Sequence, residues 1–267
     1  MYRYSMENIV FLERVNSTNT YVKEHFDELE DGTLVVTFDQ TAGRGRLNRS
    51  WHSPAGMNIA ATVVLKQVQE GFHAGAILGL AGLECVRESA PQQPAFLKWP
   101  NDIYVEDRKL AGILCEGAKI ENGHVTGVAA GIGINVNLPG EFLEKIDQPA
   151  TSLLFLEKRE FNLVFLAKKL AKSIKRYYII YLNSHKILLD QWRAANLLTG
   201  ETVSVVDAAG RRMTGVFKTI AGDGAMMLET AEGLQTFSCG DVKIDRGSVD
   251  WKKLSRKIVK IEKEQNE

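Results

Sequence analysis

Residues 43–51, with the sequence GRGRLNRSW, combine cations, glycines and an aromatic ring in one short loop. Arg44, Arg46 and Arg49 supply permanently charged, planar donors that suit phosphate or carboxylate oxygens. The glycines let the backbone approach a ligand closely, and Trp51 offers a flat face on which a nucleobase can stack. The loop lacks the G-x-x-x-x-G-K-[ST] spacing of a P-loop. Charge alone favours an anion-binding loop but leaves a basic surface loop open.

A second group of polar residues flanks two expected strands between residues 98 and 114. The sequence KWPND ends the first strand, where Pro100 fits because it cannot donate to a sheet ladder. Lys109 precedes an apolar stretch that would hold its backbone while its ammonium neutralises a carboxylate and a phosphate oxygen together. The alternative is a surface lysine before a buried strand, which is the commoner case from the pattern alone.

Two further motifs offer surfaces for a small ligand. Gly131 and Gly133 occupy alternate positions of an expected strand, so one face of that strand is bare backbone. The pair lacks the third glycine and the following helix of a Rossmann dinucleotide site. Ser17, Thr18 and Asn19 provide capping chemistry for a helix, and hydroxyls at a helix N-terminus also bind polar ligand groups.

Composition argues against several classes of function. Lys plus Arg and Asp plus Glu each number 33 in 267 residues, so no net charge favours nucleic acid or an acidic membrane. The three cysteines, Cys85, Cys115 and Cys239, are scattered, which is typical of a reducing cytoplasm. Neither metal-ligand spacing nor a G-x-S-x-G nucleophile motif occurs, and we assign no metal ligands. No signal peptide or membrane-length apolar stretch is recognised.

Hydrophobic patterns predict that an α+β domain positions these groups. We expect strands at residues 9–12, 33–38, 58–65, 95–98, 103–105, 110–116 and 125–135. Helices are expected from a cap near Ser17 to about Leu29, and at 72–89, 161–182 and 186–197. Asn122-Gly123 is a strong hairpin signal, so the sheet should be largely antiparallel.

Short β-branched runs separated by glycine-centred turns follow Leu198, as far as about Asp245. This spacing predicts a small all-β barrel. We therefore divide the chain into a larger domain at 1–198, a C-terminal β-domain at 199–247 and a charged tail at 248–267. The basic residues of the tail favour a solvated, frayed helix over a membrane or nucleic-acid patch.

Taken together and in this order, the motifs resemble the biotin protein ligase family. The matching blocks are S-T-N at 17–19, G-R-G-R-x-x-R-x-W at 43–51, K-W-P-N-D-I at 98–103, R-K-L-A-G-I-L at 108–114 and G-I-G-I-N at 131–135. The resemblance implies a class II synthetase-like catalytic domain, with a mixed sheet packed by helices, and an SH3-like β-barrel. It also implies an ATP-dependent reaction in which biotinyl-5′-AMP forms and then acylates a lysine of a biotin carboxyl carrier protein of acetyl-CoA carboxylase or a related carboxylase.

The resemblance assigns roles to individual residues. The catalytic residues would be Lys109, which bridges the biotin carboxylate and the α-phosphate, and Arg46. The biotin-binding set would be Ser17, Thr18, Asn19, Gln40, Arg44, Gly45, Arg46, Lys109, Gly131 and Gly133. The ATP-binding set would be Arg46, Arg49, Trp51, Asn101, Lys109 and Asn135, with Lys98 and Asp102 near the nucleotide. The arginine loop would close over biotin and its adenylate, and ATP implies Mg²⁺ without a dedicated site.

The chain departs from the family pattern at three points. Asn16 stands where an aspartate often precedes S-T-N, which puts a role for that carboxylate in doubt. Asn48 replaces a frequent glycine, but asparagine tolerates the same backbone region. Sixteen residues precede Ser17, too few for the helix-turn-helix of about sixty residues in bifunctional members. We therefore expect a cytoplasmic enzyme that does not act as a DNA-binding repressor and does not bind a membrane. A homodimer is compatible with the resemblance.

Two alternatives differ in substrate or in class. Lipoate–protein ligases share the superfamily and an acyl-adenylate mechanism, but G-R-G-R-x-x-R-x-W and K-W-P-N-D favour biotin. A non-catalytic biotin-binding protein would have no use for the phosphate-neutralising cations Arg44, Arg46 and Lys109. The sequence therefore favours a biotin ligase over both alternatives.

Overall fold

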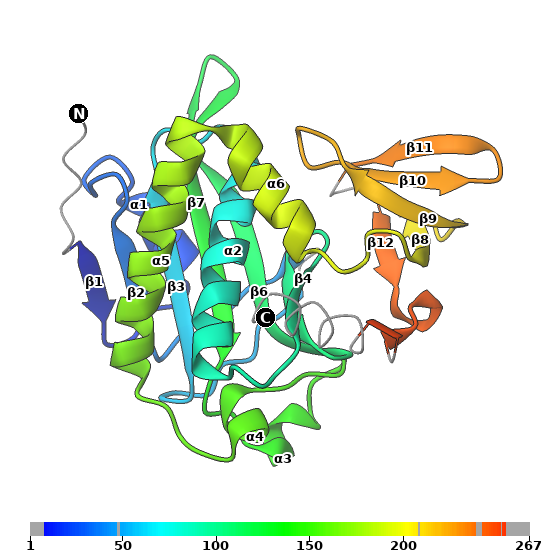
Figure 1. The fold of residues 1–267 in the computed structure, drawn as a ribbon. Coiled ribbons are helices and arrows are strands. Elements are labelled where there is room, and N and C mark those ends of the chain that lie inside the picture. Colours follow the sequence, from blue (N-terminus) through cyan, green and yellow to red (C-terminus); the bar gives the residue numbers. More distant parts are fainter. Residues whose placement is uncertain (1–7, 47–48, 208, 239–241, 252, 255–267) are drawn as a thin grey trace, which may run out of the picture.

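The computed structural model describes residues 8–254, apart from 47–48, 208, 239–241 and 252, and contains a larger and a smaller sheet (Figure 1). The larger sheet has seven strands in the order β1-β2-β3-β7-β6-β5-β4. Its strands are β1 (Ile9–Leu12), β2 (Leu34–Thr37), β3 (Asn58–Leu65), β4 (Ala95–Lys98), β5 (Asp102–Val105), β6 (Arg108–Glu121) and β7 (His124–Asn135). β1 and β2 are parallel, and the other neighbouring pairs are antiparallel. The predicted α+β class with a mixed sheet is confirmed.

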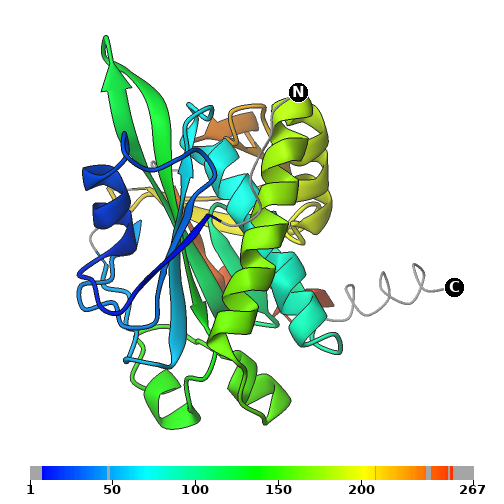
Figure 2. The ribbon, with the colours of Figure 1, turned by 90° about the vertical axis from the view of Figure 1, so that its left-hand side faces the viewer.

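Helices cover both faces of the larger sheet (Figure 2). α2 (Gly71–Ser89), α5 (Leu163–Asn183) and α6 (His185–Ala195) form a layer on one face, and α1 (Thr18–Glu24) lies on the other. A sheet covered on both faces has strands that are apolar throughout, without a polar alternate position. This explains why residues 59–65 of β3 are apolar apart from Thr62.

β3 shows how the two faces are filled. Ala61 and Val63 join the main core cluster on the α2 side. Val64 points the other way and packs with Val22 and Phe26 of the α1 side. All eight residues of β3 are buried. The period of two along a strand thus supplies both cores from one segment.

The structure differs from the sequence-based expectations in the lengths of some elements. α1 ends at Glu24, because Glu28 and Leu29 make turn hydrogen bonds to the carbonyl of His25 in place of further helix. β6 and β7 extend into a long hairpin whose turn residues, Asn122 and Gly123, have φ of 52° and 79°. Positive φ at both positions is what an Asn-Gly hairpin requires. Two short helices, α3 (Gly140–Leu143) and α4 (Leu153–Glu157), were not expected.

The smaller sheet is antiparallel, in the order β11-β10-β9-β8-β12. Its strands are β8 (Thr202–Asp207), β9 (Arg212–Ile220), β10 (Met226–Thr230), β11 (Gly233–Phe237) and β12 (Val242–Asp245), followed by the short 3₁₀ helix η2 (Arg246–Ser248). The expected β-domain is confirmed, but in the described residues β11 and β12 remain edge strands, so the expected closed barrel is an open sheet. Cys239 and most of the predicted tail lie outside the described residues, and the domain bounds stay predictions.

The turn between β9 and β10 attaches the smaller sheet to the larger part of the protein. Three side chains donate hydrogen bonds to alternate carbonyl oxygens from the end of β9 through this turn: Arg193 to Ile220 (2.9 Å), His73 to Gly222 (2.8 Å) and Trp99 to Gly224 (3.0 Å). Gly224 has a φ of +84° and contacts Phe72, whose ring leaves no space for a β-carbon. Because Trp99 belongs to the KWPND segment, the smaller sheet is fixed directly beside the candidate site.

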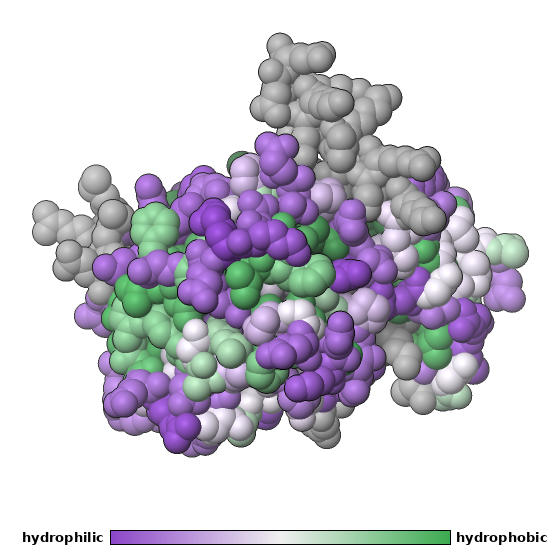
Figure 3. All heavy atoms as spheres, turned by 90° about the horizontal axis from the view of Figure 1, so that it is seen from below, coloured by the Kyte–Doolittle hydropathy of each residue, from purple (hydrophilic) through white to green (hydrophobic). Residues whose placement is uncertain are grey.

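The surface seen from below carries an apolar area on the side of the larger sheet, interrupted by hydrophilic side chains (Figure 3). Phe11, Val164 and Phe165 are among the large apolar side chains that remain exposed on the protein. Within the described part of the chain, none of the helices combines the length and apolar character needed to cross a membrane.

Candidate active site

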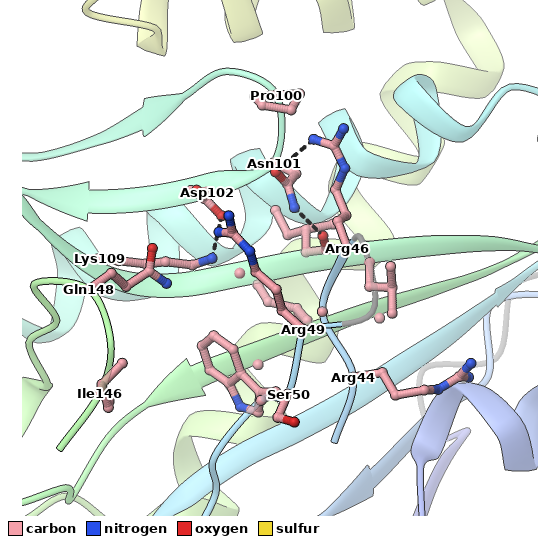
Figure 4. Close-up of a pocket in the computed structure, with 18 of the residues that line it drawn as sticks. Arg44, Arg46, Arg49, Ser50, Pro100, Asn101, Asp102, Lys109, Ile146 and Gln148 are labelled. Atoms are coloured by element: carbon pink, nitrogen blue, oxygen red, sulfur yellow. Dashed lines mark hydrogen bonds and ion pairs between the residues drawn. The ribbon is translucent and has the colours of Figure 1, made fainter. Parts of the chain in front are cut away.

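A cavity of about 940 Å³ lies between the two sheets and gathers most of the residues singled out from the sequence. Its lining comes from the start of α1, the 44–52 loop, the β4–β5 turn, the middle of β6 and β7, residues 146–149 and the smaller sheet. Figure 4 shows Arg44, Arg46 and Arg49 extending from the loop in different directions, with Lys109 and Gln148 on the left of the view. The predicted site residues lie together here, with one exception, Asn135.

The residues that the sequence resemblance assigns to biotin form a buried polar network at the start of α1, at one end of the cavity. Ser17 is the N-cap of that helix. The backbone N–H and the hydroxyl of Thr18 both donate to Gln40 Oε1, at 2.9 and 3.2 Å. Thr62 Oγ1 lies 2.8 Å from Thr18 Oγ1 and 2.7 Å from Asn19 Oδ1. These groups are oriented by one another, as a site that recognises a polar ring requires. Thr62 was missed, although it is the one polar residue within the apolar run of residues 59–65.

Gly131 and Gly133 are required because side chains lie directly against their backbone. A β-carbon on Gly131 would sit 2.1 Å from Asn19 Oδ1, and one on Gly133 would sit 2.5 Å from the Trp51 ring. Both separations are far shorter than van der Waals contact. The bare strand face predicted from the G-x-G pattern is therefore present, and Asn19 and Trp51 lie on it.

Glu116 organises the groups around α1 and was not anticipated. Asn19 Nδ2 donates to it at 2.8 Å, Lys23 Nζ pairs with it at 2.8 Å, and Arg44 Nη2 pairs with it at 3.0 Å. Burial raises the pKa of Glu116, but the hydrogen bonds from Lys23 and Asn19 and the charges of Lys23 and Arg44 outweigh it, so the pKa lies below its ordinary value. Glu116 is thus an ionised anchor that holds Arg44 toward α1. No motif in the sequence pointed to it.

Lys109 reaches into the cavity because of a β-bulge. β5 and β6 change register between Ile103 and Tyr104, which leaves Leu110 as the extra residue. A regular strand would place Lys109 on the same face as Ile113, against α2; the bulge moves it to the face of Gly112, where the Lys109 Nζ lies 3.0 Å from the position of a Gly112 β-carbon. Insertion of one residue thereby aims the lysine at the site.

An acidic residue holds the Lys109 ammonium in place. Lys109 Nζ pairs with Asp102 Oδ1 at 2.7 Å, with both side chains about one-seventh exposed. The same ammonium lies 5.7 Å from the centre of the Trp51 ring. Lys98, a buried neighbour, has its pKa lowered to about 8 by burial, with the charges of Lys109, Arg246 and Arg46 acting in the same direction and that of Asp102 opposing. This part of the cavity therefore places two lysines, Lys98 and Lys109, around the Asp102 carboxylate.

The three arginines of the loop point in different directions (Figure 4). Arg44 turns toward α1, whereas Arg49 extends into the cavity on the side of Lys109. Arg46 turns away from Lys109, and its Nη1 donates to Asn101 Oδ1 at 3.2 Å. Asn101 is itself anchored by donation from Nδ2 to the Ile113 carbonyl at 2.6 Å. The loop backbone closes on itself through the Gly45 N–H and the Arg49 carbonyl, at 2.7 Å. Asn48 lies outside the described residues.

Asn135 is the predicted site residue that the structure does not bring to the cavity lining. Its side chain is 3% exposed, and its Nδ2 donates to the Thr151 carbonyl at 3.0 Å. Two arginines that were not anticipated also line the cavity: Arg212 of β9 in the smaller sheet, and Arg246 of η2. Arg212 pairs with Asp245, and Arg246 donates to the Asp107 carbonyl. These arginines reach the cavity only because of how the smaller sheet packs beside the larger one, and no local sequence pattern predicts that packing.

Comparison with known proteins bears directly on this arrangement. Residues 11–135 match the biotin/lipoate A/B protein ligase family, and residues 199–244 match the biotin protein ligase C-terminal domain. A biotin–[acetyl-CoA-carboxylase] ligase of Mycobacterium tuberculosis is 32% identical over 218 residues, which are 79% of this chain and 79% of the relative. The chain belongs to the biotin protein ligase family.

Other members of the family extend the comparison. The bifunctional ligase/repressor BirA of Bacillus subtilis is 30% identical over 226 residues, covering 80% of this chain and 66% of that protein. The structure of an Aquifex aeolicus biotin protein ligase in complex with biotin and ATP superposes with a TM-score of 0.75, at 28% identity, and covers 90% of this chain and 99% of that one. The family fold is thus present over nearly the whole described chain.

Proposed function

We propose that this protein uses ATP to join biotin to the acceptor lysine of a biotin carboxyl carrier protein, through biotinyl-5′-AMP. The observation that carries the proposal is the Lys109–Asp102 pair, at 2.7 Å, in one cavity with the arginine loop and the polar network of α1. A buried polar recognition end and a cationic end suit the two halves of an acyl-adenylate. Family membership and the biotin and ATP named for the Aquifex aeolicus complex support the same reaction.

In the first step a biotin carboxylate oxygen attacks the α-phosphorus of ATP, the bond to the leaving phosphate oxygen breaks, and pyrophosphate departs. Two anions must meet for this attack, so fixed cations lower its barrier. Lys109 supplies the charge where carboxylate and phosphate meet, with Asp102 holding its ammonium in place. Arg49 extends toward the same region (Figure 4). Arg46 would leave Asn101 for the phosphate, because a phosphate oxygen is a stronger acceptor than an amide.

In the second step the neutral amine of the carrier lysine attacks the acyl carbon, the bond to AMP breaks, and an amide forms with release of a proton. Closure of the arginine loop would shield the anhydride from water before the carrier arrives. Lys109 can stabilise the departing AMP phosphate from the same position. One set of cations thus serves both steps.

Mg²⁺ would accompany ATP rather than occupy a site of the protein. Mg²⁺ is usually held by one or two carboxylates together with substrate phosphates. Among the described residues there is no cluster of three His, Cys, Asp or Glu side chains that could hold a metal. Asp102 lines the cavity and could contribute one oxygen. We therefore include Mg²⁺ in the proposal as a companion of the phosphates.

The proposal is tested by biotin-dependent exchange of labelled pyrophosphate into ATP, followed by transfer of biotin to a carrier domain. We expect both activities with biotin and neither with lipoate. Exchange supported by lipoate alone would instead favour the lipoate ligase alternative. Biotin binding without any exchange, in folded protein, would leave only a binding function.

The proposal also covers the type of carrier, whereas the compartment and the assembly state stay predictions. The relatives' names point to a carrier of acetyl-CoA carboxylase, and we propose a carrier of this type. Cytoplasmic residence, a homodimer and the absence of DNA binding stay predictions. Affinity capture with a carrier domain would test the carrier, light scattering the homodimer, and a DNA-binding assay the absence of DNA binding.

A further inference from the structure

A second, smaller cavity adjoins the candidate active site on the side of α2. Its volume is about 340 Å³, and its walls come from the first turns of α2, the β4–β5 turn, β6, the β9–β10 turn and Ser238. It shares Arg46, residues 100–101 and residues 113–114 with the larger cavity, so the two cavities meet there. We name it the side groove; the residues that line it alone include Phe72, Gly75, Asp223 and Ala225.

The inner end of the side groove lies level with the place where carboxylate and phosphate would meet. Asn101 Nδ2 donates to the Ile113 carbonyl at 2.6 Å, and the Ile113 N–H donates to the Asn101 carbonyl at 2.9 Å. Ile113 follows Gly112, and Lys109 Nζ lies 3.0 Å from the position of a Gly112 β-carbon. Because Lys109 marks the meeting point in the proposed reaction, an amine that reached Asn101 along the groove would arrive beside the acyl carbon of the adenylate.

Arg46 lies at the junction of the two cavities. Its side chain lines both of them, and its Nη1 donates to Asn101 Oδ1 at 3.2 Å. Its guanidinium lies beside Asn101 and toward Pro100, away from Lys109 (Figure 4). The proposed move of Arg46 to the phosphate would take this guanidinium from the junction. Formation of the adenylate would therefore widen the inner end of the side groove.

The lining of the side groove suits the side chain of a lysine. Phe72, Gly75, Ile113 and Ala225 give it largely apolar walls. Asp223 also lines it and is exposed, so a carboxylate lies at its outer edge. A carboxylate attracts the ammonium of an approaching lysine, whereas apolar walls contact its methylene groups and favour the neutral amine that the attack requires. Charge and polarity thus change along the groove in the order that an acceptor lysine needs.

We propose that the acceptor lysine of the carrier protein enters through the side groove, with Asp223 at the outer edge and Arg46 at the inner end. The inference rests on the proposed function, because it takes the adenylate as the acyl donor. The neutral amine forms a C–N bond to the acyl carbon, the bond from this carbon to the AMP phosphate oxygen breaks, AMP leaves with that electron pair, and the amine loses a proton to water. The carrier would then contact the protein where α2 and the β9–β10 turn meet.

The experiment obstructs the side groove and leaves the larger cavity unchanged. Gly75→Leu adds a bulky side chain to the groove. Gly75→Ala is the matched control, because its β-carbon would lie 3.8 Å from Cys115 Sγ and 4.0 Å from Ile113 Cγ2, in ordinary contact. Asp223→Asn removes a charge and keeps the side-chain oxygen that accepts from the Ala225 N–H at 3.0 Å.

Two assays separate the two steps of the reaction. Biotin-dependent pyrophosphate exchange reports formation of the adenylate. Single-turnover transfer from the preformed adenylate to a carrier domain of acetyl-CoA carboxylase reports arrival of the lysine. A thermal melt verifies that each variant is folded.

For Gly75→Leu we expect transfer to slow about tenfold or more, because leucine takes the path of the lysine, whereas exchange should stay within about twofold. Gly75→Ala should behave as the unmodified protein in both assays. For Asp223→Asn we expect kcat/KM for the carrier to fall about threefold at low salt, and the difference should vanish as salt screens the charge. Transfer at the unmodified rate by folded Gly75→Leu, or equal losses of exchange and transfer, would overturn the inference.

The proposed function and the side groove fail in different ways. Absence of biotin-dependent exchange in the unmodified protein would refute the proposed function. Normal exchange, with transfer unaffected in Gly75→Leu and Asp223→Asn, would refute the side groove alone. If Gly75→Leu did not fold, the low-salt comparison of Asp223→Asn with the unmodified protein would decide, and equal kcat/KM values for the carrier would overturn the inference.

Discussion

Adding one methyl group at Gly131 should displace Asn19 and thereby weaken biotin binding or lower the stability of the fold. The new β-carbon of Gly131→Ala would lie 2.1 Å from Asn19 Oδ1, so the Asn19 side chain must leave its position. Asn19 would then lose its contacts to the Leu114 carbonyl (3.0 Å), Glu116 (2.8 Å) and Thr62 (2.7 Å). At about 1 kcal/mol for each hydrogen bond, two or three lost contacts correspond to about 2–3 kcal/mol.

If the loss falls on ligand recognition, biotin should bind about 30- to 150-fold more weakly, measured by calorimetry. If it falls on folding, the melting temperature should drop by about 5–10 °C. Gly75→Ala is the matched control, because its β-carbon would meet nothing nearer than Cys115 Sγ at 3.8 Å and alanine is the better helix former. A Gly131→Ala protein with unchanged biotin affinity and unchanged melting temperature would refute this account of the site.

Four further substitutions test the cations and their partners. Lys109→Ala should reduce biotin-dependent pyrophosphate exchange by about a hundredfold or more, with a smaller loss of biotin affinity; equal losses would point to simple ligand binding. Arg46→Gly should release the adenylate, so that lysines of bystander proteins become biotinylated on blots; labelling confined to the carrier would contradict the lid. The Glu116 pKa is lowered in the folded state, so ionised Glu116 should raise the free energy of unfolding at pH values above its unfolded pKa. This contribution should be lost as the pH falls through the acidic range, and the free energy of unfolding of Glu116→Gln, measured with urea, should not show that loss. Lys98 has a pKa lowered to about 8, so the activity that depends on its charge should fall as pH rises through that value, and Lys98→Arg should remove the fall in a pH–rate profile.

Motifs that depend on local chemistry can be recognised from the sequence. The arginine loop, KWPND and the S-T-N block could be found because each residue type has a direct chemical use at its position. The Asn122-Gly123 turn is confirmed because the constraint it meets, positive φ at two successive residues, is local. The two short helices were missed because four or five residues are too few to show a helical period, and the early end of α1 was missed because local turn hydrogen bonds to the His25 carbonyl end it.

The sequence by itself determined the fold class, the family and the kinds of groups that the site would contain. Only the tertiary structure decided how those groups are arranged. Glu116 contacts Lys23 and Arg44 because β6 passes beside α1. Asn135 is buried because its side chain donates to the Thr151 carbonyl next to the end of β7. Lys109 faces the cavity because one extra residue, Leu110, shifts the register of β6. Side chains alternate along a strand with a period of two, so a one-residue shift exchanges the two faces, and only the pairing of strands distant in sequence reveals it.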